Sequence, residues 1–236
     1  MRPGSSSPTR SWPLVDAPAE RVTTFLRAVY GWMVVGLAIT AVVAAAVASS
    51  PTLARIFASN HLLFIGVLVA ELGLVFYLSA RVPSLTPPAA AILFLAYAGL
   101  NGVTLSVLML AYTGRSIATA FVVTAGTFGA LVLFGSTTKR SLAGAGQFFY
   151  MGLVGLVLAS IVGFFWQSDA LQFLISVVGV IVFTGLTVWD AQRLKQMAAG
   201  PQALSGSYAI VGALSLYLNF VNLFLILLRF QGGRRT

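Results

Sequence analysis

Residues 62–80 read LLFIGVLVAELGLVFYLSA, an apolar run with a single charged side chain, Glu71. About 20 apolar residues in a helix span the hydrocarbon core of a bilayer. A strand of a membrane barrel would be about half as long and would alternate in polarity. The run does not alternate. It therefore predicts one membrane-spanning helix.

Six more runs of this kind follow one another along the chain. With the first, they cover residues 26–48, 62–80, 89–110, 117–135, 148–165, 171–188 and 208–228. Pro and Gly in the short breaks, as at Pro87-Pro88 and Gly200-Pro201, disfavour helix continuation. The sequence predicts an all-α integral membrane protein, a seven-transmembrane-helix bundle over residues 25–236. Residues 1–24, rich in Pro, Ser and Arg, are expected to form a polar, mobile tail.

The composition of the whole chain supports a membrane protein. Of 236 residues, 58% are hydrophobic and 8% are charged, against roughly a quarter charged in soluble proteins. The net charge of +9 comes from scattered residues beside apolar runs, which favours membrane flanks over nucleic acid. With no Cys and one His, neither a metal site nor a cofactor is expected, and no motif suggests an enzyme. Lys139 and Lys195 are predicted to lie in loops, which excludes a retinal Schiff base.

The distribution of Lys and Arg predicts the orientation of the chain, because cytoplasmic loops carry the excess of these residues. If the N-terminus is cytoplasmic, the inner segments hold Arg2, Arg10, Arg21, Arg27, Arg81, Lys139, Arg140, Arg193 and Lys195. The outer segments hold Arg55, Arg115, Arg229, Arg234 and Arg235. The count of nine against five predicts a cytoplasmic N-terminus and a C-terminus on the outer side of the membrane.

Ionisable residues inside a span are functional candidates, because burying a charge in a bilayer is costly. Glu71 lies near the middle of the second span and Arg81 at its end. Asp190 ends the sixth span and Arg229 the seventh. Plainer interpretations stay open. Asp190 could pair with Arg193 one turn away, Glu71 could be protonated or in a structural ion pair, and Arg229 could extend to the headgroups.

Polar residues also form a stripe on the seventh span. Gly212, Ser215, Asn219, Asn222 and Arg229 follow at spacings of 3, 4, 3 and 7, which keep to one helix face. In lipid the Asn amides would lack partners, so this face is expected to point into the bundle. The stripe predicts that the last helix is central. The two Asn side chains could equally serve only as hydrogen bonds between helices.

Small residues four apart in the third and fourth spans are typical of close helix packing in membranes. The two pairs are Gly102 with Ser106 and Ala125 with Gly129. Such pairs carry no information about function. They do predict that these two helices approach neighbours at those positions.

Three stretches together resemble the Bax inhibitor family, and its bacterial branch in particular. They are residues 105–142 (LSVLMLAYTGRSIATAFVVTAGTFGALVLFGSTTKRSL), 185–195 (GLTVWDAQRLK) and 212–229 (GALSLYLNFVNLFLILLR). The resemblance implies a bundle in which six helices enclose the last one. It also implies a pH-dependent calcium leak, as described for bacterial members, whereas some enterobacterial members are known as modulators of a membrane-anchored AAA protease.

The resemblance also implies roles for particular residues. The family's pH sensor is a pair of aspartates, of which Asp190 matches the first. Asn219 stands in place of the second, since this chain reads YLNF where relatives read YLDF. Two close carboxylates share a proton, but an amide does not titrate. Asn219 can still donate a hydrogen bond to Asp190, so the helix pairing is expected to persist while the pH gating changes.

Two further matches concern charged partners. Glu71 and Arg229 match an acid and an arginine thought to latch the bundle, and Arg81 approximately matches a basic partner of the sixth-helix aspartate. The resemblance thus implies a calcium leak in the bacterial inner membrane, gated by Asp190, Asn219 and Arg81. The alternative is a modulator that binds a membrane protease through residues 1–24. A proton-coupled transporter is disfavoured, because the chain shows no internal repeat.

Overall fold

A computed structural model describes residues 19–166 and 168–231. The elements are α1 (Ala19–Ser49), α2 (Pro51–Ser59), α3 (His61–Arg81), α4 (Pro87–Ala111), α5 (Gly114–Thr137), α6 (Ala143–Phe165), α7 (Asp169–Ala199), the 3-10 turn η1 (Pro201–Leu204) and α8 (Gly206–Gln231). Seven of these helices are long and apolar enough to cross a membrane. The predicted all-α bundle of seven spans is therefore confirmed.

Local capping explains where several helices begin. The hydroxyl of Ser50 accepts a hydrogen bond from the Leu53 amide, and Pro51 follows as the first residue of α2. Thr113 caps α5 and Ser168 caps α7 in the same way. A hydroxyl at this position satisfies an amide that has no partner within the helix. The short helix α2 and the turn η1 were not among the predicted elements.

Two predicted boundaries differ most from the structure. Helix α1 begins at Ala19, so residues 19–24 belong to the first span rather than to the tail. The remaining tail, residues 1–18, lies outside the described residues. Helix α7 continues to Ala199, which places Lys195 on a helix and not in a loop. In both cases the charged residues at the helix end gave no apolar signal, although the backbone continues to form its hydrogen bonds beyond the hydrophobic stretch.

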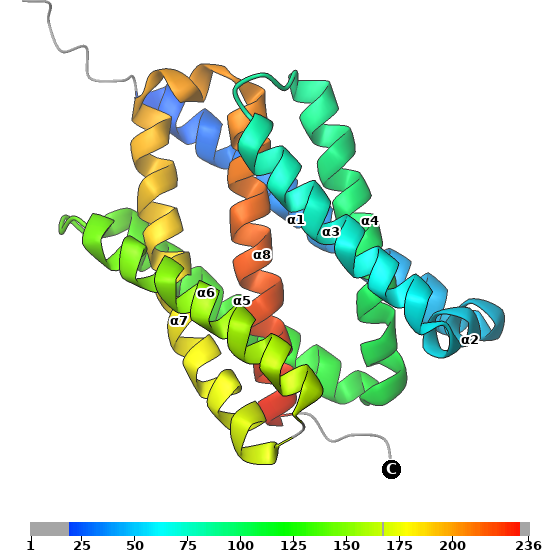
Figure 1. The fold of residues 1–236 in the computed structure, drawn as a ribbon. Coiled ribbons are helices and arrows are strands. Elements are labelled where there is room, and N and C mark those ends of the chain that lie inside the picture. Colours follow the sequence, from blue (N-terminus) through cyan, green and yellow to red (C-terminus); the bar gives the residue numbers. More distant parts are fainter. Residues whose placement is uncertain (1–18, 167, 232–236) are drawn as a thin grey trace, which may run out of the picture.

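Helix α8 occupies the centre of the bundle, as the polar stripe predicts (Figure 1). Each spanning helix contains an apolar stretch of 18 residues. In α8, 67% of these residues are buried inside the protein, against 44% in α7 and 11% in each of α3 and α6. It packs against α1, α3, α4, α5 and α7, while α6 packs mainly on α7. The expectation that six helices enclose α8 is corrected in this respect, because α6 lies in an outer position.

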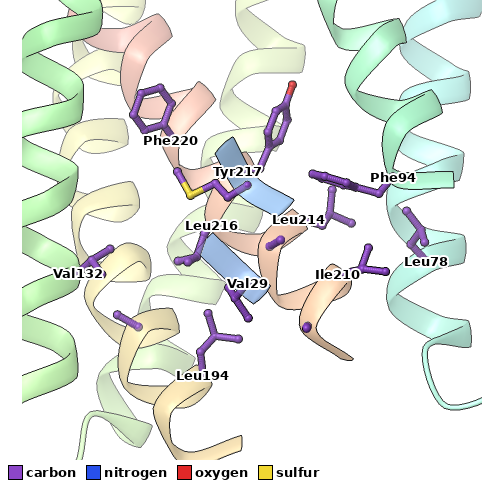
Figure 2. Packing of buried hydrophobic residues seen from close by; sticks show 14 of the residues in the cluster. Val29, Leu78, Phe94, Val132, Leu194, Ile210, Leu214, Leu216, Tyr217 and Phe220 are labelled. Carbon is purple, nitrogen blue, oxygen red and sulfur yellow. The ribbon is translucent and has the colours of Figure 1, made fainter. Parts of the chain in front are cut away.

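The core around α8 consists of large apolar side chains from several helices. Figure 2 shows Tyr217 and Leu214 of α8 on the side of Phe94 of α4 and Leu78 of α3, and Leu216 on the side of Leu194 of α7. The rings of Phe94 and Tyr217 meet edge to face with centroids 5.9 Å apart. Lipid tails are as apolar as leucine, so close packing, rather than escape from water, holds such helices together.

Close helix contacts depend on two glycines. A Cβ at Gly102 of α4 would lie 2.8 Å from the carbonyl oxygen of Thr40 in α1, and a Cβ at Gly135 of α5 would collide with the carbonyl oxygen of Val188 in α7. The prediction for Gly102 is thus confirmed. The one for Gly129 was wrong, because a Cβ there would meet nothing within 4 Å. Spacing alone does not say which face of a helix meets a neighbour.

Candidate functional site

A buried hydrogen bond joins α7 and α8 at the predicted gate residues Asp190 and Asn219. The Nδ2 atom of Asn219 in α8 donates to Oδ2 of Asp190 in α7 across 2.7 Å. Both residues are buried, with 5% and 6% of their surface exposed. The predicted contact is therefore present. The amide supplies the donor that a buried carboxylate oxygen needs.

The second oxygen of Asp190 has a weaker partner. Arg193 lies one turn along α7, with its guanidinium nitrogen 3.9 Å from Oδ1, as the plainer interpretation predicted. Its guanidinium also lies over the ring of Trp189, 5.3 Å from the centroid. Within the described residues, Asp190 Oδ1 accepts no hydrogen bond and has only this distant guanidinium as an ion-pair partner, which leaves it available to a cation.

The predicted role of Arg81 as the counter-ion of Asp190 was wrong for this conformation. Arg81 is exposed at the end of α3. Its carbonyl oxygen accepts hydrogen bonds from the amides of Ser84 and Leu85 in the following turn. Within residues 19–166 and 168–231, the only salt bridge joins Asp190 to Arg193. The nearer arginine on the same helix takes the place that the resemblance assigned to Arg81.

The predicted latch between Glu71 and Arg229 was also wrong. Glu71 is buried and accepts hydrogen bonds from Asn101 and Thr104 of α4. Arg229 is exposed near the end of α8, where it lines a recess of about 560 Å3 together with Asp169. Glu71 lies ten residues into α3, a depth of about 15 Å along the helix axis. The two side chains therefore sit at different depths in the bundle.

The polar stripe of α8 divides into residues that bind other helices and residues that do not. Asn219 donates to α7. Ser215 donates to the carbonyl oxygen of Val211, and Asn222 to that of Leu218, each within its own helix. The interpretation of both Asn side chains as links between helices holds for Asn219 alone. Backbone carbonyls one turn earlier satisfy the other two side chains.

A second polar cluster, missed in the sequence, lies on the opposite side of α8. Tyr217 donates from its hydroxyl to Oδ1 of Asn101 across 3.0 Å, and the same hydroxyl lies 2.7 Å from Oγ1 of Thr40 in α1. Asn101 in turn donates to Glu71 across 3.3 Å. We call these residues, with Thr104, the Glu71 chain. The spacing of Asn101 and Thr104 on one face of α4 was the available signal.

The loop between α5 and α6 is fastened to α7 near Asp190. Buried Gln192 donates to the carbonyl oxygen of Arg140 and accepts from the amide of Leu142, across 2.7 and 2.9 Å. Lys195 donates to the carbonyl oxygen of Ser136 across 2.7 Å. The helix segment that holds Asp190 therefore also holds this loop.

A Gln192→Ala variant is expected to release that loop. Losing two hydrogen bonds of about 1 kcal/mol each corresponds to roughly 30-fold faster exchange of the Leu142 amide. Hydrogen exchange followed by mass spectrometry over residues 138–142 measures the change. Gln196→Ala, on the same helix but exposed, serves as the control. Equal exchange in the two variants would contradict the fastening role.

No cluster of three or more His, Asp or Glu that could hold a metal ion occurs among the described residues. The site thus consists of one buried carboxylate at the α7–α8 contact and a second one, Glu71, between α3 and α4. Each carboxylate can take up a proton, and Asp190, whose Oδ1 has only the distant guanidinium of Arg193 beside it, can also bind a cation.

The amino-acid sequence is similar to a known protein family and to several bacterial proteins. A family model described as "Inhibitor of apoptosis-promoting Bax1" matches residues 22–236. Inner membrane protein YbhL of Escherichia coli is 46% identical over 222 residues, which cover 92% of this chain and 95% of that protein. An uncharacterised protein of Borreliella burgdorferi is 42% identical over 90% of this chain and 93% of its own length. Protein RP147 of Rickettsia prowazekii is 40% identical over 92% of both chains.

Proposed function

Because the chain belongs to the Bax inhibitor family and is a multi-pass protein of the bacterial inner membrane, we propose that it provides a passive path for calcium. The observation that supports this most is the buried carboxylate of Asp190, which has one short hydrogen bond and one distant arginine. Calcium binds oxygen ligands, carboxylates above all. In this proposal the N-terminus is cytoplasmic, the C-terminus is periplasmic, and Asp190 forms the gate near the cytoplasmic end.

The proposal gives Asn219 a specific role. It holds α7 against α8 through Asp190 without itself taking up or releasing a proton. The helix contact at the gate is therefore expected to lose the steep pH response that two carboxylates sharing one proton would give. Arg193, the charged neighbour of Asp190, takes the part of the counter-ion.

An Asn219→Asp variant tests both the path and its gating. Wild-type protein in liposomes loaded with a calcium dye is expected to conduct calcium above the level of empty liposomes. The variant is expected to respond to pH more steeply, by up to about tenfold per pH unit, because one proton is then shared at the contact. Asn222→Asp, at the neighbouring polar position that bonds only within α8, is the matched control.

The outcomes separate the path from its gating. No wild-type flux at any pH would overturn the calcium path, and it would favour the alternative function as a modulator of a membrane protease. Flux with the same pH profile in wild type and Asn219→Asp would retain the path and overturn the role of Asn219.

A further inference from the structure

The Glu71 chain joins four helices through side-chain hydrogen bonds. It runs from Thr104 and Asn101 of α4 to Glu71 of α3 on one side, and from Asn101 through Tyr217 of α8 to Thr40 of α1 on the other. In Figure 2 the hydroxyl of Tyr217 points away from the apolar side chains around its ring. Burial at this depth means that every polar hydrogen in the chain needs an acceptor within the protein.

With Glu71 ionised, all hydrogen bonds point toward the carboxylate. Thr104 and the amide nitrogen of Asn101 donate to its two oxygens. Asn101 then offers its Oδ1 to the hydroxyl of Tyr217. The Tyr217 oxygen is left to accept from Thr40, 2.7 Å away, where either hydroxyl can be the donor. A carboxylate accepts only, so this direction suits the charged form.

With Glu71 protonated, the same atoms satisfy one another in the opposite direction. The carboxyl O–H donates to the amide oxygen of Asn101, whose side chain turns over and presents its NH2 to the Tyr217 oxygen. Tyr217 then donates to Thr40. The Thr40 hydroxyl has two acceptors ready, the carbonyl oxygens of Gly36 and Ala98, each 2.9 Å away.

We propose that Glu71 binds a proton reversibly and that proton binding reverses the hydrogen bonds from Asn101 through Tyr217 to Thr40. Thr104 can follow, because its hydroxyl also lies 3.3 Å from the carbonyl oxygen of Leu100. In both states each side chain of the Glu71 chain has a hydrogen-bond partner, so the Glu71 chain can form with Glu71 charged or neutral. The proton comes from the aqueous phase and no other reactant is consumed.

The groups around Glu71 are consistent with a proton as the ligand. The titratable groups that interact with it electrostatically include, among the described residues, the phenols of Tyr97 in α4 and Tyr217 in α8. Helix α2, which also packs on α3, contributes one charged residue, the exposed Arg55. No salt bridge to Glu71 occurs within the described part of the chain. Asn101 and Thr104 already donate to both carboxylate oxygens, whereas a metal ion would have to displace them.

Proton binding at Glu71 bears on the central helix. Tyr217 and Asn219 are two residues apart in α8, so the Glu71 chain and the Asp190 contact hold the helix at one depth from opposite sides. A change in the direction of one set of bonds acts on the same turn of α8 that carries the other. The inference does not rest on calcium permeation, because proton binding is measured directly.

The protein contains two glutamates, Glu20 and Glu71. Glu71 can therefore be followed without altering the residues around it. Protein labelled with carbon-13 at the glutamate carboxyl carbons gives two NMR signals in lipid nanodiscs. A Glu20→Gln variant, altered at an exposed position, identifies the signal of Glu71. We expect that signal to shift with pH in a single reversible step over the range in which the protein stays folded. A signal that does not move would overturn proton binding.

A second pair of variants tests the reversal along the chain. Tyr217→Phe keeps the ring that packs on Phe94 and Tyr97 but removes the hydroxyl, and it is expected to shift the midpoint of the Glu71 step. Tyr208→Phe, on the same helix outside the chain, should leave the midpoint unchanged. Thr40→Val provides the same test at the far end of the chain if Tyr217→Phe fails to fold. Equal midpoints in wild type and the chain variant would overturn the coupling.

Discussion

Replacing Asn219 with leucine is expected to lower the free energy of unfolding by about 2 kcal/mol, the cost of removing a hydrogen bond to a buried charged group. The substitution removes the short hydrogen bond to Oδ2 of Asp190 and leaves a buried carboxylate with Arg193, 3.9 Å from Oδ1, as its charged partner. Neutral hydrogen bonds between membrane helices contribute only about 0.6 kcal/mol on average. The effect should therefore exceed that of an ordinary polar contact.

Unfolding by SDS in mixed micelles measures this difference. Asn222→Leu is the matched control, since that amide bonds to a carbonyl oxygen of its own helix, and it should cost about 0.5 kcal/mol or less. The double variant Asp190→Leu with Asn219→Leu should recover much of the loss, because no buried charge then remains. Equal losses in Asn219→Leu and Asn222→Leu would mean that the Asp190 contact contributes little to stability.

Replacing Gly135 with alanine is expected to cost about 3 kcal/mol, a value typical of overpacking in a rigid contact. The new Cβ would collide with the carbonyl oxygen of Val188 and lie 3.0 Å from Cβ of Ala191. A backbone carbonyl cannot rotate away as a flexible side chain can. Helices α5 and α7 must therefore separate along the segment that carries Asp190.

Gly129→Ala on the same helix separates this effect from helix propensity. A Cβ at Gly129 meets nothing within 4 Å, and alanine favours a helix over glycine by up to about 1 kcal/mol. This control should therefore be neutral or slightly stabilising in the same unfolding assay. If the two alanine variants unfold alike, the close contact between α5 and α7 is absent from the protein in solution.

The sequence predicted the parts of this structure that depend on one helix at a time. Seven apolar runs predicted seven spans, and the polar residues along 208–228 predicted that the last helix is central. The stripe did not predict its buried face, because Ser215 and Asn222 are only half-buried and Arg229 is exposed. The contact between Asp190 and Asn219 was predicted from a resemblance that already pairs these positions. In each case the required signal lies in local spacing or in a known pair of positions.

The sequence failed where the relative depth of two helices decides the contact. Glu71 and Arg229 are opposite charges in a charge-poor chain, yet they lie at different levels and do not form the latch. The partners of Glu71 are neutral residues, Asn101 and Thr104, which no count of charges could reveal. Gly102 and Gly129 show the same limit, since equal spacing led to one close contact and one open face.

The central position of α8 has a consequence for the biosynthesis of the protein. The helix that fills the middle of the bundle, α8, follows the other six spans in the chain and is therefore made after them. Until it enters the bilayer, α1 and α4 can pack on each other, as can α5 and α7, but all four lack the surface that α8 provides. Tyr217 and Asn219 gain their partners only in that final step. The contacts on both sides of α8 therefore form only after the other six spans have been made.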